Sequence, residues 1–287
     1  ASIGRLEQKS PDGGHERRLF YDKCGRYLFI AAACLMTIII FSIIFFVGRQ
    51  GLMTFAEVSP MEFFFSASWD PSLGKYGALS FIIGSLATTL LSVAIGAPVW
   101  LKNIMRPATD LYVAIPSVVY GYVGLQLLVP YLRDTFGTTT GFGVLAASLV
   151  LAIMIMPTIL SISTDALNAV PRPLEEASLA LGATWWQTMV HVIVPAAAPG
   201  ILTAVVLAMA RAVGETMAVQ MLIGNTPQVI TSLFSPTATL TSDIVVEMGN
   251  TPFGSVWGNA LFLMAFVLLL LSLAMILVIR RFGTRRV

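Results

Sequence analysis

The residues of this sequence most suited to chemistry are Arg211 and Glu215, two charges that interrupt an otherwise apolar stretch at 205–224. Placing one charge in the middle of a bilayer costs roughly 2.5–3.5 kcal/mol or more, so such residues are candidates for function. The guanidinium of Arg211 offers a planar fork of donors that matches the oxygens of an oxyanion, and it does not deprotonate near neutral pH. We therefore expect Arg211 to contact an anion on a path through the membrane.

The residues that follow Arg211 extend this prediction. Glu215 comes four residues later, so the two charges would share one face of a helix. Glu215 could then pair with Arg211 in an empty path and weaken anion binding enough to allow release. Thr216 and Gln220 would add neutral hydrogen bonds near that face. The alternative is a purely structural ion pair, because buried pairs often leave stability unchanged.

Other kinds of chemistry are not indicated. The chain lacks a G-x-x-x-x-G-K-[ST] phosphate loop, so we do not expect it to hydrolyse ATP through that motif. Its histidines (His15, His191) and cysteines (Cys24, Cys34) do not have the spacing of a metal site. A net charge of +2 is too small to indicate nucleic-acid binding. Uphill transport would therefore need energy from an ion gradient or from another subunit.

The composition indicates an all-α protein that crosses a membrane several times. Hydrophobic residues make up 56% of the 287 residues and charged residues 11%, whereas a soluble domain has about 25% charged residues. A membrane-spanning helix needs roughly 20 mostly apolar residues. Six segments qualify: Tyr27–Val47, Gly77–Leu101, Leu111–Leu132, Phe142–Ile162, Gly200–Gly224 and Val256–Ile279. Small residues on the second segment predict close helix packing. They are Gly84, Ser85, Thr88, Ser92 and Gly96.

The distribution of Lys and Arg sets the expected orientation. With the N-terminus inside, thirteen of the 17 basic residues lie on the cytoplasmic side, three lie outside and Arg211 lies in the membrane. This excess predicts that both termini are cytoplasmic. Residues 1–26 would form a solvated cytoplasmic tail, and residues 27–287 the six-span domain.

The long cytoplasmic connection at 165–199 is typical of two short helices that meet in an L. Two prolines and two acidic residues favour a helix start; they are Pro171, Pro173, Glu175 and Glu176. Gly182 would end this helix, and a second would run from Thr184 to Val192. A stripe of apolar and small residues follows the first helix; it comprises Leu174, Ala177, Ser178 and Leu181. An interfacial hairpin and a docking element fit these residues equally well.

The same connection contains a more specific motif, Glu176-Ala177-Ser178, then Gly182-Ala183, then Ile193-Val194-Pro195. It resembles the EAA loop of ABC importer permeases, written E-A-A, then G, then I-x-L-P, with Ser in place of the second Ala and Val in place of Leu. The resemblance implies a type I ABC importer permease whose coupling helix, residues 174–183, inserts into a groove on an ATPase subunit. The implied coupling residues are Leu174, Glu175, Glu176, Ala177, Ser178, Leu181, Gly182 and Ala183.

Three further segments narrow this resemblance. They are Trp69-Asp70-Pro71 with Tyr76-Gly77, AIPSVVYGYVGL at 114–125, and RAVGETMAV at 211–219. They look like the permeases of phosphate-specific importers. Of the two related permease types, the ETMAV form resembles PstC, because the PstA type usually reads G-E-T-A-P there.

The resemblance implies a permease that passes phosphate from an extracytoplasmic phosphate-binding protein into the cytoplasm, across the bacterial cytoplasmic (inner) membrane. Its further partners would be a homologous PstA-type permease, two ATPase subunits and membrane lipid. The ATPase subunits would bind ATP and Mg, and this chain would bind no cofactor. The loop Asn225–Ser255 would face outside, where it either contacts the binding protein or is an ordinary solvated loop.

Three other functions stay open at this point. A permease of the same type could carry sulfate or molybdate, since one Arg/Glu pair does not distinguish these oxyanions by charge. A passive anion channel would have no use for the coupling loop. A membrane scaffold for phosphate signalling would leave Arg211 without a role.

Overall fold

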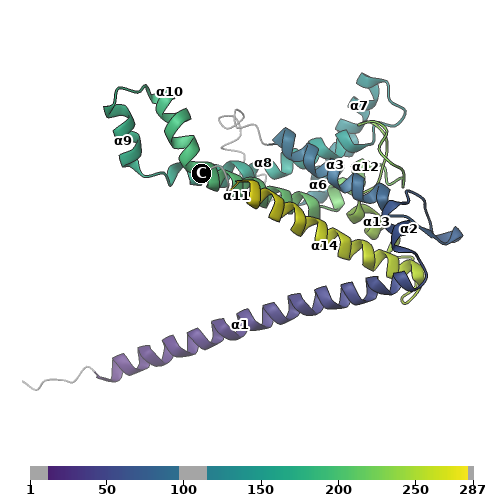
Figure 1. The fold of residues 1–287 in the computed structure, drawn as a ribbon, viewed down its shortest axis with the longest axis horizontal. Coiled ribbons are helices and arrows are strands. Elements are labelled where there is room, and N and C mark those ends of the chain that lie inside the picture. The colour runs from purple at the N-terminus through teal and green to yellow at the C-terminus, as the bar shows by residue number, and fades with distance from the viewer. Residues whose placement is uncertain (1–11, 97–114, 284–287) are drawn as a thin grey trace, which may run out of the picture. The chain divides into compact units, whose positions relative to one another are not determined.

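The computed structural model describes residues 12–96 and 115–283, which are almost entirely helical (Figure 1). The chain divides into two units, residues 1–49 and 50–287, and each is described by itself. Within the described residues, five helices are long and apolar enough to cross a membrane. They are Gly25–Ala56, Leu79–Gly96, Val144–Asn168, Trp185–Gly214 and Val256–Arg281. The chain is therefore an all-α, multi-pass membrane protein, as its composition predicts.

The first unit consists of most of helix α1, Asp12–Leu52. At about 1.5 Å per residue, its 41 residues extend about 60 Å, twice the thickness of a bilayer hydrocarbon core. The predicted span Tyr27–Val47 lies within this helix. The helix also continues back to Asp12, so no change in the backbone separates this span from residues 12–26 of the predicted tail. Residues 1–11 lie outside the described part of the chain.

The second, fourth and sixth predicted spans are present with shifted ends. They correspond to α3 (Leu79–Gly96), α8 (Val144–Asn168) and α14 (Val256–Gly283). Residues 97–101, at the end of the second predicted span, lie outside the described residues. All five small residues predicted to pack on α3 are buried. The Ser148 hydroxyl of α8 donates to the carbonyl of Thr88 on α3 at 3.3 Å, which confirms the close approach of these helices.

The third predicted span, Leu111–Leu132, is described only from residue 115 onward. It is helical in three consecutive pieces: α6 (Ser117–Val123), a π turn (η4, Gly124–Leu128) and α7 (Val129–Phe136). The π turn precedes Pro130, whose missing N–H interrupts the regular helical hydrogen bonding. Residues 111–114 are not among the described residues, so the third span, Leu111–Leu132, stays a prediction as a complete crossing.

The fifth predicted span, Gly200–Gly224, is wrong at both ends. Its helix runs from Trp185 to Gly214 and contains α10 (Trp185–Thr188), a π turn (η5, Met189–Ile193) and α11 (Val194–Gly214). A short helix, α12 (Met217–Ile223), follows after a break. Pro195 does not end the helix, because it lies in the first turn of α11 and the preceding π turn accommodates its missing donor. The separate short helix predicted for Thr184–Val192 is therefore wrong, since that segment begins the span.

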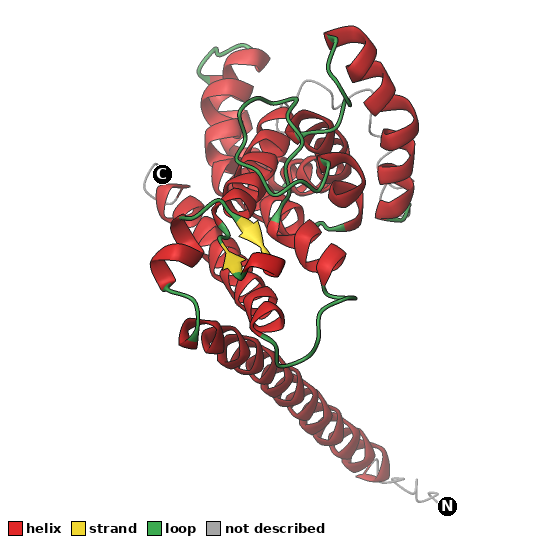
Figure 2. Cartoon of the chain, turned by 90° about the vertical axis from the view of Figure 1, so that its right-hand side faces the viewer, coloured by secondary structure: helices red, strands yellow, loops and turns green. Residues whose placement is uncertain are grey.

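The second unit has two opposite ends, called here the hairpin end and the α9 end. The hairpin end carries strands β1 (Trp69–Asp70) and β2 (Lys75–Tyr76), which pair antiparallel (Figure 2). Three short helical elements adjoin this hairpin: η1 (Met53–Ala56), α2 (Pro60–Phe65) and η2 (Pro71–Leu73). The α9 end carries α9 (Arg172–Ala180) beside α10 and lies on the opposite side of the unit (Figure 1).

Helix α13 (Leu240–Glu247) lies in the loop Asn225–Ser255, and its first turn is buried rather than solvated. Residues 240–243 are each at most 7% exposed. At the other end of α13, the Glu247 carboxylate accepts hydrogen bonds from the indole N–H groups of Trp69 (2.8 Å) and Trp257 (2.6 Å). Burial raises the pKa of Asp243, which lies outside the five candidate spans, to about 8, and the charge of Glu247 adds to this effect. An ordinary solvated loop therefore does not describe residues 237–243, whereas residues 225–229 of the same loop are exposed.

The raised pKa of Asp243 predicts that the fold loses stability as the pH rises. Below about pH 4 the carboxyl is protonated in the folded and unfolded chain, whereas between about pH 4 and about pH 8 only the folded chain retains the proton. The free energy of unfolding should therefore fall across this window and change no further above it. We expect the thermal midpoint of the purified chain in detergent to fall more steeply with pH for the wild type than for Asp243→Asn, which has no proton to lose.

Asp134→Asn is the matched control, because the Asp134 side chain is 68% exposed and pairs with Arg133 at the surface. Its midpoint should follow the wild-type pH curve. If the Asp243→Asn curve also followed the wild type, the buried carboxyl would not be the source of the pH dependence.

Candidate functional site

The predicted pathway residues gather around the break that separates α11 from α12. Helix α11 ends at Gly214, and Glu215 adopts an extended conformation (φ −70°, ψ 127°). The amide of Gln220 donates to the carbonyl of Thr216 at 2.8 Å, which starts the next helical turn. The prediction that Arg211 and Glu215 share one helix face is therefore wrong, because the helix ends between them. Gly214 favours this ending, since glycine is a weak helix former with a wide choice of backbone conformations.

Arg211 lies in the last turn of α11, where the negative end of the helix dipole favours a cation. Its side chain is exposed, and its Nη1 donates one long hydrogen bond of 3.5 Å to the Thr158 hydroxyl of α8. Within the described part of the chain, Arg211 and Glu215 form no ion pair within 4.0 Å, so their predicted pairing is absent from this structure. Most of the guanidinium donors thus remain available to a ligand.

The other three predicted pathway residues are half-buried beside the break. The Thr216 hydroxyl donates to the carbonyl of Gly214 at 3.2 Å, which satisfies a backbone group freed by the break. The carbonyl of Gln220 accepts from the side-chain amide of Asn225 at 2.8 Å. All four predicted pathway residues (Arg211, Glu215, Thr216 and Gln220) thus lie next to the break. The hydroxyl of Thr216 is hydrogen-bonded to the backbone.

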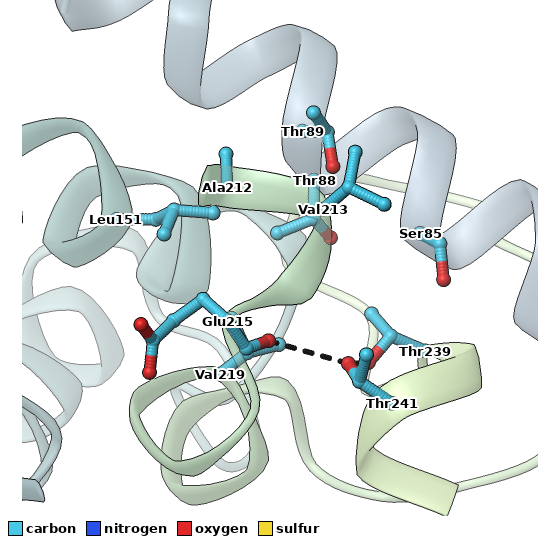
Figure 3. A pocket seen from close by; sticks show the side chains of 10 residues that line it. All are labelled: Ser85, Thr88, Thr89, Leu151, Ala212, Val213, Glu215, Val219, Thr239 and Thr241. Carbon is cyan, nitrogen blue, oxygen red and sulfur yellow. Dashed lines mark hydrogen bonds between the residues drawn. The ribbon is translucent and has the colours of Figure 1, made fainter. Parts of the chain in front are cut away.

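A set of hydroxyl groups beside the break was not predicted. They line a cavity of about 10 Å³ between α3, the break and the start of α13, and they belong to Ser85, Thr88, Thr89, Thr239 and Thr241 (Figure 3). The cavity has room for about one water molecule and is too small for an oxyanion. The Thr241 hydroxyl donates to the carbonyl of Glu215 at 3.3 Å, while the Glu215 carboxylate points away from Thr241 (Figure 3). The hydroxyl-rich run TATLTSD at 237–243 is the signal that could have indicated this cluster.

The predicted coupling residues lie in α9 and the turn after it. The amides of Gly182 and Ala183 donate to the carbonyls of Leu179 (2.9 Å) and Ser178 (3.3 Å), and Gly182 has a positive φ of 85°. This is a Schellman ending, so the prediction that Gly182 ends the helix is confirmed. The Ser178 and Thr188 hydroxyls lie 2.9 Å apart and join α9 to α10.

The outward face of the α9 end combines exposed leucines with an acidic residue. Leu181 is 90% exposed and Leu174 is 45% exposed, and Glu176 and Ala177 are exposed between them. Nothing in the described part of the chain covers these side chains. Exposed leucines of this kind at the end of a membrane protein are available for docking.

Neither end of the unit offers a metal centre: the described residues contain no group of three or more His, Cys, Asp or Glu side chains placed to hold an ion. The candidate chemistry of this chain is therefore anion contact at Arg211 and protein docking at the α9 end.

Comparison with known proteins identifies the family. The family described as the binding-protein-dependent transport system inner membrane component matches residues 80–286. The probable ABC transporter permease protein YqgH of Bacillus subtilis is 46% identical over 91% of this chain and 91% of its own. The phosphate transport system permease protein PstC of Xylella fastidiosa is 33% identical over 81% of this chain and 80% of its own. The phosphate transport system permease protein PstA from another strain of that species is 29% identical over 69% of this chain and 74% of its own. The chain belongs to the family of inner membrane components of binding-protein-dependent transport systems.

Proposed function

We propose that this chain is the PstC-type permease subunit of an ATP-driven phosphate importer. It would pass phosphate from an extracytoplasmic binding protein into the cytoplasm. The observation that carries the proposal is the exposed Arg211 at a helix break inside the membrane-spanning part of a permease. The 33% identity to a PstC protein over most of the chain supports phosphate as the substrate.

The chemistry of Arg211 suits this substrate. Phosphate near neutral pH carries one or two negative charges on oxygens that accept hydrogen bonds from a guanidinium fork. The guanidinium makes one 3.5 Å hydrogen bond within the described residues, so its other donors can reach an anion. Glu215, half-buried on the same break, would reduce the net attraction and keep binding weak enough for the ion to leave.

A second permease subunit would complete the path. An exposed guanidinium within a membrane is costly unless water or a polar partner faces it. We infer that the exposed side of the break faces a homologous PstA-type permease across a shared central path. The 29% identity between this chain and a PstA protein supports a pair of related folds.

The α9 end would dock on an ATPase subunit, two of which would bind the ATP and Mg that this chain does not bind itself. Because α10, η5 and α11 form one helix, only the short turn at 181–184 separates the docking surface from the helix that ends at Gly214. Those 30 residues extend about 45 Å, longer than the membrane core is thick. Closure of the ATPase pair would pull α9 and tilt this helix, which would move Arg211 relative to the other permease.

The orientation follows from the Lys and Arg distribution. We place both termini and the α9 end in the cytoplasm of a bacterium and the hairpin end outside its inner membrane. Phosphate would then enter from a binding protein at the hairpin end. This chain would act as a transport subunit and not as an enzyme.

Replacing Arg211 tests the substrate path. In the complete complex reconstituted into liposomes, we expect Arg211→Gln to lower phosphate uptake at least about tenfold, because a neutral amide loses the charge-assisted contacts. ATP hydrolysis should continue. Labelled phosphate, sulfate and molybdate would be compared at equal amounts of assembled complex.

Arg133→Gln is the control, since Arg133 forms a surface pair with Asp134. It should transport like the wild type. Normal phosphate uptake by Arg211→Gln would assign the arginine a structural role. Selective uptake of sulfate or molybdate by the wild type would show that phosphate is not the substrate. The assignment of the chain as a permease would still hold.

Replacing Leu181 tests the docking surface. Leu181→Asp places a charge at a 90% exposed leucine among the coupling residues, so we expect the ATPase that co-purifies with the permease pair to fall about tenfold. Leu73→Asp, on a 68% exposed leucine at the hairpin end, should retain the ATPase. Equal ATPase content in both variants would contradict docking through α9.

A further inference from the structure

Helix α12 is held at both ends by one short segment, residues 237–241, which we call the bracket. At the far end of α12, the amide of Thr237 donates to the carbonyl of Ile223 at 3.0 Å. At the near end, the hydroxyl of Thr241 donates to the carbonyl of Glu215 at 3.3 Å. The bracket therefore fixes the distance between the break and the end of α12.

The bracket is itself fixed to α3. The amide of Leu240 donates to the hydroxyl of Ser85 at 2.9 Å, and each residue of the bracket is at most 7% exposed. Gly84 allows this contact, because a Cβ built on it would overlap the carbonyl oxygen of Ala238. The Thr239 hydroxyl accepts from the amide of Ser242 at 3.2 Å and caps α13. The break thus rests on a buried, fully connected support.

The bond from Thr241 holds the backbone carbonyl of Glu215 on the α13 side of the break. A helix break leaves backbone carbonyls without helical partners, and in a membrane each of them must find another donor. Thr241 supplies that donor for Glu215 and draws its carbonyl toward α13. The Glu215 carboxylate lies on the other side of the residue and points away from Thr241 (Figure 3).

We propose that Thr241 is a positioning residue for transport, which acts by holding the carbonyl of Glu215 so that the Glu215 carboxylate faces the anion path. This inference rests on the proposed function, because it takes Arg211 and Glu215 to be on that path. Helix α13 connects the bracket to the hairpin, because its last residue, Glu247, accepts a hydrogen bond from the indole N–H of Trp69. A protein that binds to the hairpin and displaces it would thus also displace α13 and the bracket, which orient Glu215.

The test compares Thr241→Val, which removes the hydroxyl but keeps the shape, with Thr241→Ser, which keeps the hydroxyl. Thr226→Val is the control, because the exposed Thr226 hydroxyl bonds to Gly224 in its own loop at 3.1 Å. Each variant is reconstituted with the partner permease, the ATPase and the binding protein. Phosphate uptake and ATP hydrolysis are measured against the concentration of phosphate-loaded binding protein.

We expect Thr241→Val to lower the maximal uptake rate about tenfold at an unchanged KM, with ATP hydrolysis retained, because a hydrogen bond to the break is lost. Thr241→Ser should recover uptake to within about twofold of the wild type, as expected for a retained donor. Thr226→Val should match the wild type.

Normal uptake by Thr241→Val would overturn the inference, as would an equal loss in Thr241→Ser. Failure of Thr241→Val to assemble, or a loss of ATP hydrolysis in parallel with uptake, would overturn it too, because the bond would then serve folding alone. Absence of phosphate uptake by the wild type would instead contradict the proposed function.

Discussion

The constraint on which this structure depends is that a backbone carbonyl or amide inside a membrane must have a hydrogen-bond partner. A continuous helix meets this requirement by itself, whereas a helix that stops at Gly214 and resumes at Met217 does not. The hydroxyls of Thr216 and Thr241 supply the missing donors for the carbonyls of Gly214 and Glu215. These two side chains thus satisfy backbone groups at the break, and Arg211 lies one turn before it.

The helix pattern also provides a mechanical connection between the α9 end and the break at Gly214. The helix Trp185–Gly214 begins beside the exposed turn after α9 and ends at the break. Two π turns in the unit, η4 and η5, precede prolines and allow the helices to continue past them. A force applied at Leu181 would therefore pass through the short turn at 181–184 and then along one continuous helix to Arg211. We regard this as the physical basis for coupling ATPase closure to the proposed anion path.

Much of the fold could be predicted, because it depends on local signals. Long apolar runs gave four spans near their observed positions, and Gly182 indicated the end of α9. The ends of the fifth span were wrong because Pro195 suggested a helix end, and the π turn before it could not be anticipated from composition. The prediction that Arg211 and Glu215 share one helix face was wrong because Gly214 ends the helix. Thr241 was missed because it meets Glu215 across 26 residues of sequence, and no spacing rule predicts such a contact.

The central claim is that Arg211 faces an aqueous path and not lipid. Its most direct test is the reactivity of Arg211→Cys in the complete complex, with Cys24 and Cys34 replaced by serine and an anionic, membrane-impermeant thiosulfonate as the reagent. Leu270→Cys, at a 47% exposed position on α14, is the comparison. We predict that the cysteine at 211 reacts during ATP hydrolysis, whereas the one at 270 does not react. Equal lack of reaction at both positions would contradict the path.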